Sequence, residues 1–290
     1  MRILITGGAG FLGSALVPLL VNEGYEIFAL SRSVRSSQEN NLTWIQNDLS
    51  NGLNISKLPS NIDGVIHLAQ SPDYRNGPNG EENVFQVNVA SHAALLRYAE
   101  NANAKVFVSA STGSVYEPFD SLISEGAPVN PTGFYGASKL AAEIISGAYS
   151  NRMAICNLRV FFLYGPGQKN MFISRLIETI KTGGKVTIPT SCDGLIFVPT
   201  LHSDVAKVFK LAFEKRWEGT YNVSNPVAVS LKKVAETIAT LANVDLNLER
   251  VQQTPPVSII PSLEKLSNVF ELSDFTNLED GISKTLDFSD

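Results

Sequence analysis

The stretch that decides the fold reads Arg2-Ile3-Leu4-Ile5-Thr6-Gly7-Gly8-Ala9-Gly10-Phe11-Leu12-Gly13, an apolar run followed by a glycine-rich turn. Gly7 and Gly10 allow a tight turn and the close approach of a diphosphate, and Gly13 allows a helix to pack closely on a strand. The N–H groups and the dipole of the following helix then favour an anion. An ordinary strand-to-helix loop is the alternative, because the spacing differs from Gly-x-Gly-x-x-Gly.

Short apolar runs alternate with helix-periodic segments along the first half of the chain, which is typical of βαβ units and a parallel sheet. The sequence therefore predicts an α/β fold with a doubly wound, Rossmann-type parallel sheet. The expected strands are residues 3–6, 26–30, 43–46, 65–68, 106–109 and 154–158. The expected helices between them are residues 12–22, 84–101 and 136–150, the first with a kink at Pro18.

The alternation of apolar runs and helix-periodic segments becomes less regular after Gly165-Pro166-Gly167. We expect a dinucleotide-binding domain over residues 1–165, with a return segment at about 200–224 made of helix 205–213 and strand 221–223. The remaining residues, 166–199 and 225–290, are predicted to form a smaller substrate-binding lobe with helices at 172–181 and 231–241.

Composition excludes several classes of protein. The chain has 290 residues, 44% hydrophobic and 18% charged, which is typical of a globular protein. Its net charge of −5 and the lack of a basic run argue against a nucleic-acid partner. Two cysteines, Cys156 and Cys192, and three histidines leave little material for a disulfide framework or a metal site. With no span-length apolar stretch or signal-like start, we expect a cytoplasmic protein without a membrane partner.

The end of the second expected strand predicts the cofactor. An NAD site normally has a carboxylate there, whereas this chain has Ser31-Arg32, which suit the 2′-phosphate of NADP(H). NADP(H) is therefore preferred and NAD(H) is possible, with an exposed loop arginine as the alternative and Arg35 as a substitute. Asp48-Leu49 follows the third strand and is expected at the adenine, although Asp48 could equally cap a helix.

Tyr135 and Lys139 are the candidate proton-handling pair. A phenol has an ordinary pKa of about 10 and needs a nearby cation to exchange protons at neutral pH. Lys139 lies one helical turn after Tyr135, so its charge is expected to lower that pKa and its ammonium could also hold ribose hydroxyls. Thr112 is expected at the carboxyl end of a parallel strand, where its hydroxyl could polarise a substrate oxygen. An amphipathic helix with a half-buried tyrosine is the alternative.

Several motifs together resemble the NAD(P)-dependent epimerase/dehydratase family, the extended branch of the short-chain dehydrogenases. The resemblance covers residues 1 to about 225 and extends to the helix at 231–241. The motifs are the glycine turn, Val65-Ile66-His67-Leu68-Ala69, Asn88, Ser109-Ala110-Ser111-Thr112-Gly113-Ser114-Val115-Tyr116, Tyr135-Gly136-Ala137-Ser138-Lys139, Leu158-Arg159, Tyr164-Gly165-Pro166-Gly167-Gln168 and Asp204-Val205-Ala206.

The resemblance implies catalysis by Thr112, Tyr135 and Lys139, with Ser111 and Ser114 as competitors for the role of Thr112. It places His67 beside the cofactor rather than in catalysis, and implies a possible homodimer through residues 84–101 and 135–150. Residues and resemblance together predict cofactor contacts from Gly7, Gly10, Phe11, Leu12, Gly13, Ser31, Arg32, Asp48, Leu49, Leu68, Ala69, Asn88, Tyr135 and Lys139.

The chain departs from nucleotide-sugar members of the family at two places. Phe162 stands where they commonly have Asn, and Phe197-Val198-Pro199 replaces a run with a diphosphate-binding Arg. Aromatic surface in place of a phosphate ligand makes a less charged carbonyl or hydroxy compound credible. Arg75 or Lys169 could supply the lost cation. The expected substrate contacts are Thr112, Ser114, Phe162 and Arg75.

Three functions follow from these patterns. The first is a redox enzyme that turns over its nicotinamide cofactor on a small, sugar-like carbonyl or hydroxy substrate. The second is a nucleotide-sugar epimerase or dehydratase that retains its cofactor, and Gly113-Ser114 disfavours the dehydratase because acidic residues are expected there. The third is a non-catalytic dinucleotide sensor, against which Tyr135 and Lys139 argue.

Overall fold

The computed structural model describes residues 1–119 and 123–288. They form two compact units. The first unit comprises Met1–Pro118, Pro128–Val160 and Ala206–Tyr221. The second unit comprises Phe119–Ala127, Phe161–Val205 and Asn222–Asp290.

A seven-stranded sheet in the order β11-β6-β5-β4-β1-β2-β3 dominates the first unit. From β6 to β3 every neighbouring pair is parallel, and the chain winds outward in both directions from β1. This is the predicted α/β Rossmann-type fold. The strands are β1 (Arg2–Thr6), β2 (Glu26–Ser31), β3 (Leu42–Gln46), β4 (Gly64–His67), β5 (Val106–Thr112), β6 (Ala154–Val160) and β11 (Gly219–Val223).

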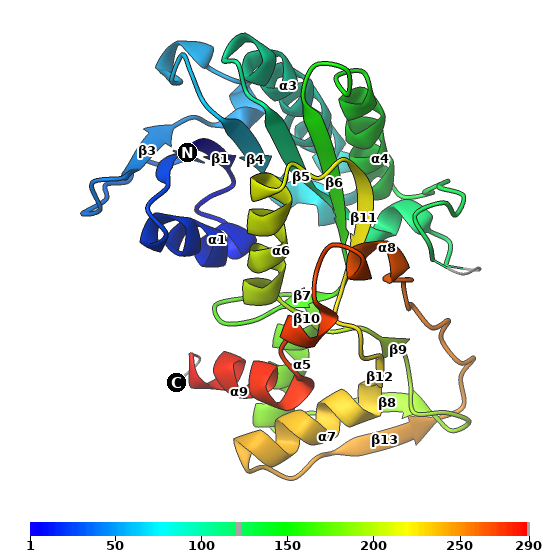
Figure 1. Ribbon diagram of the computed structural model, residues 1–290. Helices are drawn as coiled ribbons and strands as arrows, with labels where there is room; N and C mark the ends of the chain where they lie inside the picture. The colour runs from blue at the N-terminus through cyan, green and yellow to red at the C-terminus, as the bar shows by residue number, and fades with distance from the viewer. Residues whose placement is uncertain (120–122, 289–290) are drawn as a thin grey trace. The chain divides into compact units, whose positions relative to one another are not determined.

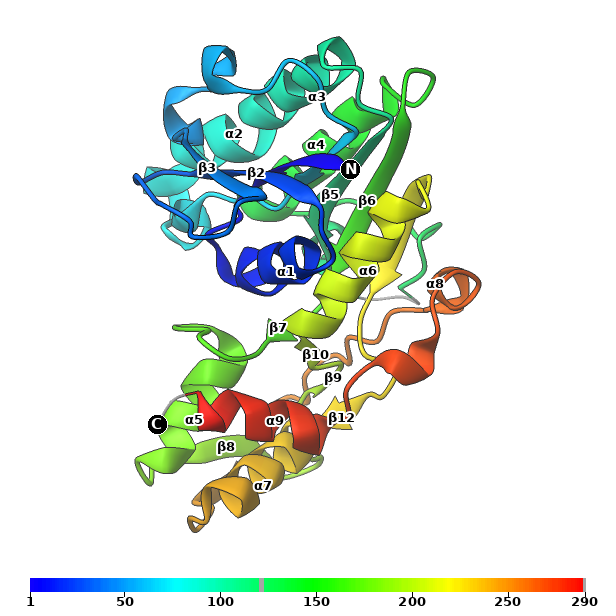
Figure 2. The same cartoon turned by 60° about the vertical axis from the view of Figure 1, so that its left-hand side comes forward.

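Helices cover both faces of this sheet, α1 and α6 on one face and α3 and α4 on the other (Figures 1 and 2). The central strands are buried along most of their length because both of their faces are covered, as in β4, where all residues are buried. Leu4, Val65 and Phe107 pack against Leu95 and Leu96 in one core. The helices are α1 (Phe11–Asn22), α3 (Ser91–Asn101), α4 (Phe134–Gly147) and α6 (His202–Glu214).

One expected helix contains a proline, and another is interrupted. Pro18 does lie inside α1, as predicted. The helix expected over 84–101 is interrupted: α2 (Glu81–Phe85) is followed by a π-helical segment, η5 (Gln86–Ala90), before α3 begins. Such wide turns recur at functional sites, and Asn88 lies in this one. Short 3₁₀ turns follow several strands: η1 (Leu49–Asn51), η2 (Ile55–Lys57), η3 (Pro72–Arg75), η4 (Gly77–Gly80) and η6 (Gly113–Tyr116).

The second unit packs helices against short strand pairs around its own core, which includes Ile177, Phe197, Ile238 and Ile282. The predicted helix 172–181 is confirmed as α5, and the helix predicted at 231–241 extends by one residue as α7. Its helices are α5 (Phe172–Lys181), α7 (Leu231–Ala242), α8 (Glu264–Ser267), η7 (Leu272–Asp274) and α9 (Leu278–Asp287). Its strand pairs are β7 (Leu163–Tyr164) with β10 (Thr200–Leu201), β9 (Ile196–Phe197) with β12 (Val229–Ser230), and β8 (Val186–Pro189) with β13 (Leu248–Val251).

Across residues 1–119 and 123–288, no helix combines the length and the apolar character that crossing a membrane requires. Cys156 is buried and Cys192 is half-buried, and these two described cysteines form no disulfide.

The glycine turn brings three backbone segments together. Gly7 has a φ of +68°, and a Cβ there would lie 2.7 Å from the backbone nitrogen of Ala69. A Cβ on Gly13 would lie 2.4 Å from the carbonyl oxygens of both Gly7 and Gly8. The turn is closed by a 2.8 Å hydrogen bond from the N–H of Gly10 to the oxygen of Gly7. Only residues without a side chain allow β1, α1 and the end of β4 to approach this closely.

We predict that Gly13→Ala lowers the free energy of unfolding by about 1–3 kcal/mol, because backbone atoms must move away from the new methyl group. Gly147→Ala is the matched control. A Cβ on this helical glycine would meet nothing within 4 Å beyond its chain neighbours and its own helix backbone, so alanine should raise stability by about 0.5 kcal/mol. Urea denaturation of both variants checks this, and equal stabilities would contradict the close approach.

Candidate active site

Tyr135 and Thr112 meet at the carboxyl end of β5. Tyr135 lies in the first turn of α4, and Thr112 is the last residue of β5. The N–H of Ser114 donates to the Thr112 hydroxyl oxygen at 3.2 Å. The Thr112 hydroxyl in turn forms a hydrogen bond with the Tyr135 phenol. The phenol also donates to Oε1 of Gln70 at 2.9 Å.

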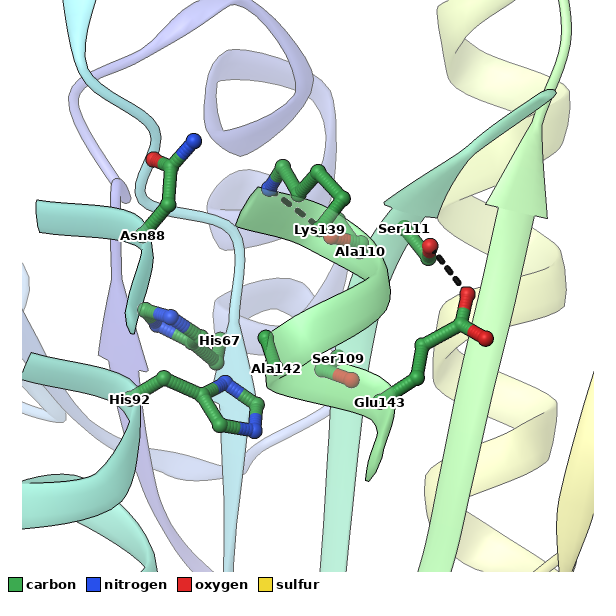
Figure 3. A pocket seen from close by; sticks show the side chains of 9 residues that line it. All are labelled: His67, Asn88, His92, Ser109, Ala110, Ser111, Lys139, Ala142 and Glu143. Atoms are coloured by element: carbon green, nitrogen blue, oxygen red, sulfur yellow. Dashed lines mark hydrogen bonds between the residues drawn. The ribbon is translucent and has the colours of Figure 1, made fainter. Parts of the chain in front are cut away.

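Lys139 lies one turn further along α4 and is 5% exposed. Its Nζ donates to the carbonyl oxygen of Ala110 at 3.0 Å, as Figure 3 shows. Burial lowers the pKa of Lys139 to about 8, although the carboxylate of Glu143 acts in the opposite direction. A lysine with this pKa changes charge close to physiological pH.

The pKa of Tyr135 differs from the prediction. The sequence led us to expect that the charge of Lys139 would lower it, but in this structure burial raises the pKa of Tyr135 above its ordinary value. The phenolate loses its hydration, and this cost exceeds the opposing effects of the Thr112 hydrogen bond and the Arg75 charge. Tyr135 therefore keeps its proton at neutral pH in the cofactor-free protein.

The loop after β4 covers Tyr135, which sequence reasoning missed. The ring of Tyr74 lies 4.9 Å from the ring of Tyr135, centroid to centroid. The guanidinium of Arg75 lies 5.0 Å from the centroid of the Tyr74 ring. Gln70 and Tyr74 follow a central strand directly at its carboxyl end, and this position is the signal that could have found them.

Asn88 joins this loop to α4. Its side-chain oxygen accepts from the N–H of Ser71 at 3.1 Å, and its side-chain nitrogen donates to Oγ of Ser138 at 3.0 Å. Ser138 immediately precedes Lys139, so Asn88 links the loop after β4 to the part of α4 that carries Lys139. Its predicted contact with a cofactor stays a prediction.

A pair of histidines lies behind Lys139. The imidazoles of His67 and His92 are 5.1 Å apart and line one small polar pocket with Lys139 (Figure 3). His67 shares a 2.6 Å hydrogen bond with Thr6, and His92 shares one of 2.7 Å with Ser146. Burial lowers the pKa of His67 well below its ordinary value and that of His92 to about 3. Both imidazoles are therefore neutral.

The residues predicted to contact the adenosine part of the cofactor lie in different surroundings. Ser31 is buried, whereas the Arg32 side chain is exposed. Arg35 lies over the ring of Trp44 at 5.3 Å. Asp48 caps η1 by accepting from the N–H of Ser50 at 3.1 Å, the alternative role considered for it. Of the remaining apolar positions, Leu49 packs in the core, and Leu68 and Ala69 are half-buried.

The aromatic residues predicted for the substrate lie in the second unit. Phe162 has a φ of +40°, and its ring lies 4.8 Å from that of Phe197. Phe197 is fully buried and Val198 nearly so. The prediction of aromatic surface is therefore wrong at Phe197, because this residue belongs to the core of its unit. The substrate contact of Phe162 stays a prediction, as does the role of the exposed Lys169.

The model of the NAD dependent epimerase/dehydratase family matches residues 3–224. The chain belongs to this family, and it is an enzyme. Among its relatives, UDP-glucuronic acid decarboxylase 6 of Arabidopsis thaliana is 28% identical over 97% of this chain and 87% of its own length. A UDP-glucose 4-epimerase of Streptomyces lividans is 32% identical over 82% of this chain and 80% of its own.

A solved structure of a relative has the same fold. MoeE5 in complex with UDP-glucuronic acid and NAD has a TM-score of 0.86 and is 30% identical, with 100% of this chain and 99% of that chain covered. This chain therefore shares its fold with a protein whose structure holds UDP-glucuronic acid and NAD.

We predict that Lys139→Met stabilises the cofactor-free protein more at pH 7 than at pH 10. The unfolded state, in which the lysine pKa is about 10.5, binds more protons than the folded state between pH 8 and 10.5, so wild-type stability rises there. Methionine removes this dependence, and the two stability differences should differ by about 3 kcal/mol.

Urea denaturation of wild type and variant at the two pH values measures this difference. Lys105→Met, at an exposed lysine next to β5, controls for the loss of a lysine as such. A Lys139→Met effect that is the same at both pH values would show that Lys139 is not buried in its charged form.

Proposed function

We propose that this enzyme transfers a hydride between a nicotinamide dinucleotide and a carbon that bears a hydroxyl or carbonyl oxygen on a nucleotide-sugar-like substrate. One observation carries the proposal. Ala69 lies against Gly7 of the glycine turn, and the adjacent Gln70 accepts a hydrogen bond from the Tyr135 phenol. A phosphate-binding turn and a proton donor are thus contacted by adjacent residues of the loop after β4.

The residues fit a dinucleotide. A Cβ on Gly10 would lie 3.0 Å from the oxygen of Gly7, so the glycines keep the turn narrow and open to a diphosphate. The turn leads directly into α1, whose N-terminal dipole favours an anion. MoeE5, which shares the fold, is described in complex with NAD. When bound, the nicotinamide accepts or donates the hydride, and its oxidised ring carries a positive charge.

The roles of the three residues follow from their surroundings. Tyr135 exchanges a proton with the substrate oxygen, and its raised pKa makes the protonated form the resting one. The Thr112 hydroxyl is held by Ser114 and polarises the same oxygen. Lys139 supplies a buried positive charge that favours phenolate when the proton leaves. Arg75 and Ser114 are proposed to contact the substrate beside them.

Retention of the cofactor is the second candidate. In this case the enzyme returns the hydride to the same substrate and acts as an epimerase, a function supported by the likeness to the Streptomyces lividans UDP-glucose 4-epimerase. Absorbance at the reduced nicotinamide band distinguishes the two, because only net redox turnover changes it stoichiometrically. We also propose a homodimer, supported by Phe85 and Ile144, which are 53% and 69% exposed on α2 and α4.

We predict that Tyr135→Phe lowers kcat by about 10²–10⁴-fold and leaves the Kd of the cofactor nearly unchanged, because one proton-transferring oxygen is lost and the ring stays. A panel of UDP-sugars and simpler hydroxy compounds, assayed by nicotinamide absorbance and product analysis, supplies the substrate. Tyr74→Phe is the matched control, since it removes a neighbouring phenol oxygen and retains the ring contact. Ordinary turnover by Tyr135→Phe would overturn the proposed mechanism.

For the cofactor, we predict tighter binding of NADPH than of NADH, by about tenfold or more, because Ser31 and Arg32 stand where an NAD site has a carboxylate. Arg32→Ala should narrow this preference mainly by weakening NADPH, as measured by fluorescence titration. Arg35→Ala is the matched control. If only this variant loses the preference for NADPH, Arg35 rather than Arg32 binds the 2′-phosphate. Equal affinities in the wild type, or tighter NADH binding, would contradict the NADP(H) preference.

A further inference from the structure

Glu143 and Arg159 form an ion pair inside the first unit. Their side chains are 7% and 6% exposed. Nη2 of Arg159 lies 2.6 Å from Oε2 of Glu143, and Nε lies 3.0 Å from Oε1. Two nitrogens thus contact both carboxylate oxygens, which is the strongest and most directional geometry for such a pair.

The pair contacts both segments that flank Thr112. The Ser111 hydroxyl donates to Oε1 of Glu143, a bond drawn in Figure 3. Nη1 of Arg159 donates to the Tyr116 hydroxyl at 2.7 Å, and the guanidinium lies 4.7 Å from the centroid of that ring. Ser111 directly precedes Thr112, and Tyr116 ends η6, which directly follows it. The position of Thr112 is therefore fixed from both sides.

The pair also attaches α4 to β5. Tyr135, Lys139 and Glu143 recur every four residues, so they lie along one face of the helix. Lys139 binds the carbonyl oxygen of Ala110, and Glu143 binds the next residue, Ser111. These two bonds hold the helix that carries Tyr135 against the strand that carries Thr112.

Glu143 also sets the charge around Lys139. The groups that face Lys139 are His67 on β4, His92 on α3 and Glu143 on α4 itself. Both imidazoles are neutral. Among the described residues that line this pocket, Glu143 is the one with a carboxylate. Its carboxylate raises the pKa of Lys139 against the effect of burial. Arg159 binds that carboxylate from the side of β6 and holds it in place.

Stability alone is a poor explanation for this arrangement. Burying two charges costs nearly as much as their attraction returns, and apolar replacements of such pairs are often neutral or stabilising. This pair instead connects Ser111, Tyr116 and α4 through hydrogen bonds. Apolar side chains could not form these bonds.

We propose that the Glu143–Arg159 pair is the positioning element of the active site. It fixes Thr112 relative to Tyr135, and the Glu143 carboxylate, which lines the same pocket as Lys139, favours the charged form of that lysine. The roles of Thr112, Tyr135 and Lys139 rest on the proposed function, but the effect of Glu143 on Lys139 is a property of the cofactor-free protein and can be measured without any substrate.

The first test is Glu143→Gln, which removes the charge at nearly constant shape. NMR titration of protein with ¹³C-labelled lysines, with the Lys139 signal assigned by its absence from Lys139→Arg, reports the protonation of Lys139 directly. In Glu143→Gln the midpoint of the Lys139 titration should fall by about 1 pH unit or more relative to wild type. Glu100→Gln is the matched control, since Glu100 pairs with Arg152 at 2.9 Å but the two side chains are 40% and 50% exposed. A Lys139 titration unchanged in Glu143→Gln would overturn the charge claim.

The second test separates geometry from charge and does not depend on Glu143→Gln folding. Arg159→Lys keeps both charges but loses the contact of two guanidinium nitrogens with the Glu143 carboxylate. We therefore expect kcat to fall about tenfold, while the Kd of the cofactor and the Lys139 titration stay unchanged. Glu143→Asp should lower kcat similarly, because its shorter side chain draws the carboxylate away from Ser111. Wild-type kcat in both variants would overturn the positioning claim. Failure of the proposed function would appear separately, as ordinary turnover by Tyr135→Phe.

Discussion

The close approach of three backbone segments at the glycine turn is the constraint on which the rest of the first unit depends. Gly7 lies against Ala69, and Gly13 lies against the carbonyls of Gly7 and Gly8 at distances that a methyl group would not permit. This approach aligns the carboxyl ends of β1 and β4, the two strands between which the winding of the sheet changes direction. In open α/β sheets ligands bind at this point. The loop that leaves β4 there runs directly to Tyr135.

Burial determines the chemistry of the residues gathered at that edge. The same loss of hydration raises the pKa of Tyr135 and lowers that of Lys139, because it disfavours the charged form of each. The cofactor-free site is therefore set to hold a protonated phenol beside a lysine whose pKa is about 8. Burial also keeps the two imidazoles behind Lys139 neutral. Glu143 is the counter-charge that opposes this trend at Lys139, and Arg159 holds its carboxylate in place.

Local patterns predicted the elements best where propensity and packing agree. The amphipathic helix over Phe172–Lys181 has the predicted bounds because its apolar face recurs at helical spacing and meets a core. The helix expected over 84–101 is different, because a π-helical turn interrupts it at Gln86–Ala90. Periodicity does not register one extra residue in a turn. Asn88 in that turn bonds to Ser71 and Ser138, which are remote in sequence, so local spacing could not show these contacts.

By itself, the sequence determined the parallel α/β fold, the glycine turn, and the placement of Thr112, Tyr135 and Lys139 on a strand end and one helix face. These depend on short-range spacing: glycines where no side chain fits, apolar runs for buried strands, and a four-residue repeat for one face of a helix. Only the tertiary structure decided that Gln70 and Tyr74 contact Tyr135, that Phe197 belongs to a core, and that Glu143 pairs with Arg159. It also decided the direction of the Tyr135 pKa, because burial and the sum of surrounding charges depend on residues that the sequence keeps far apart.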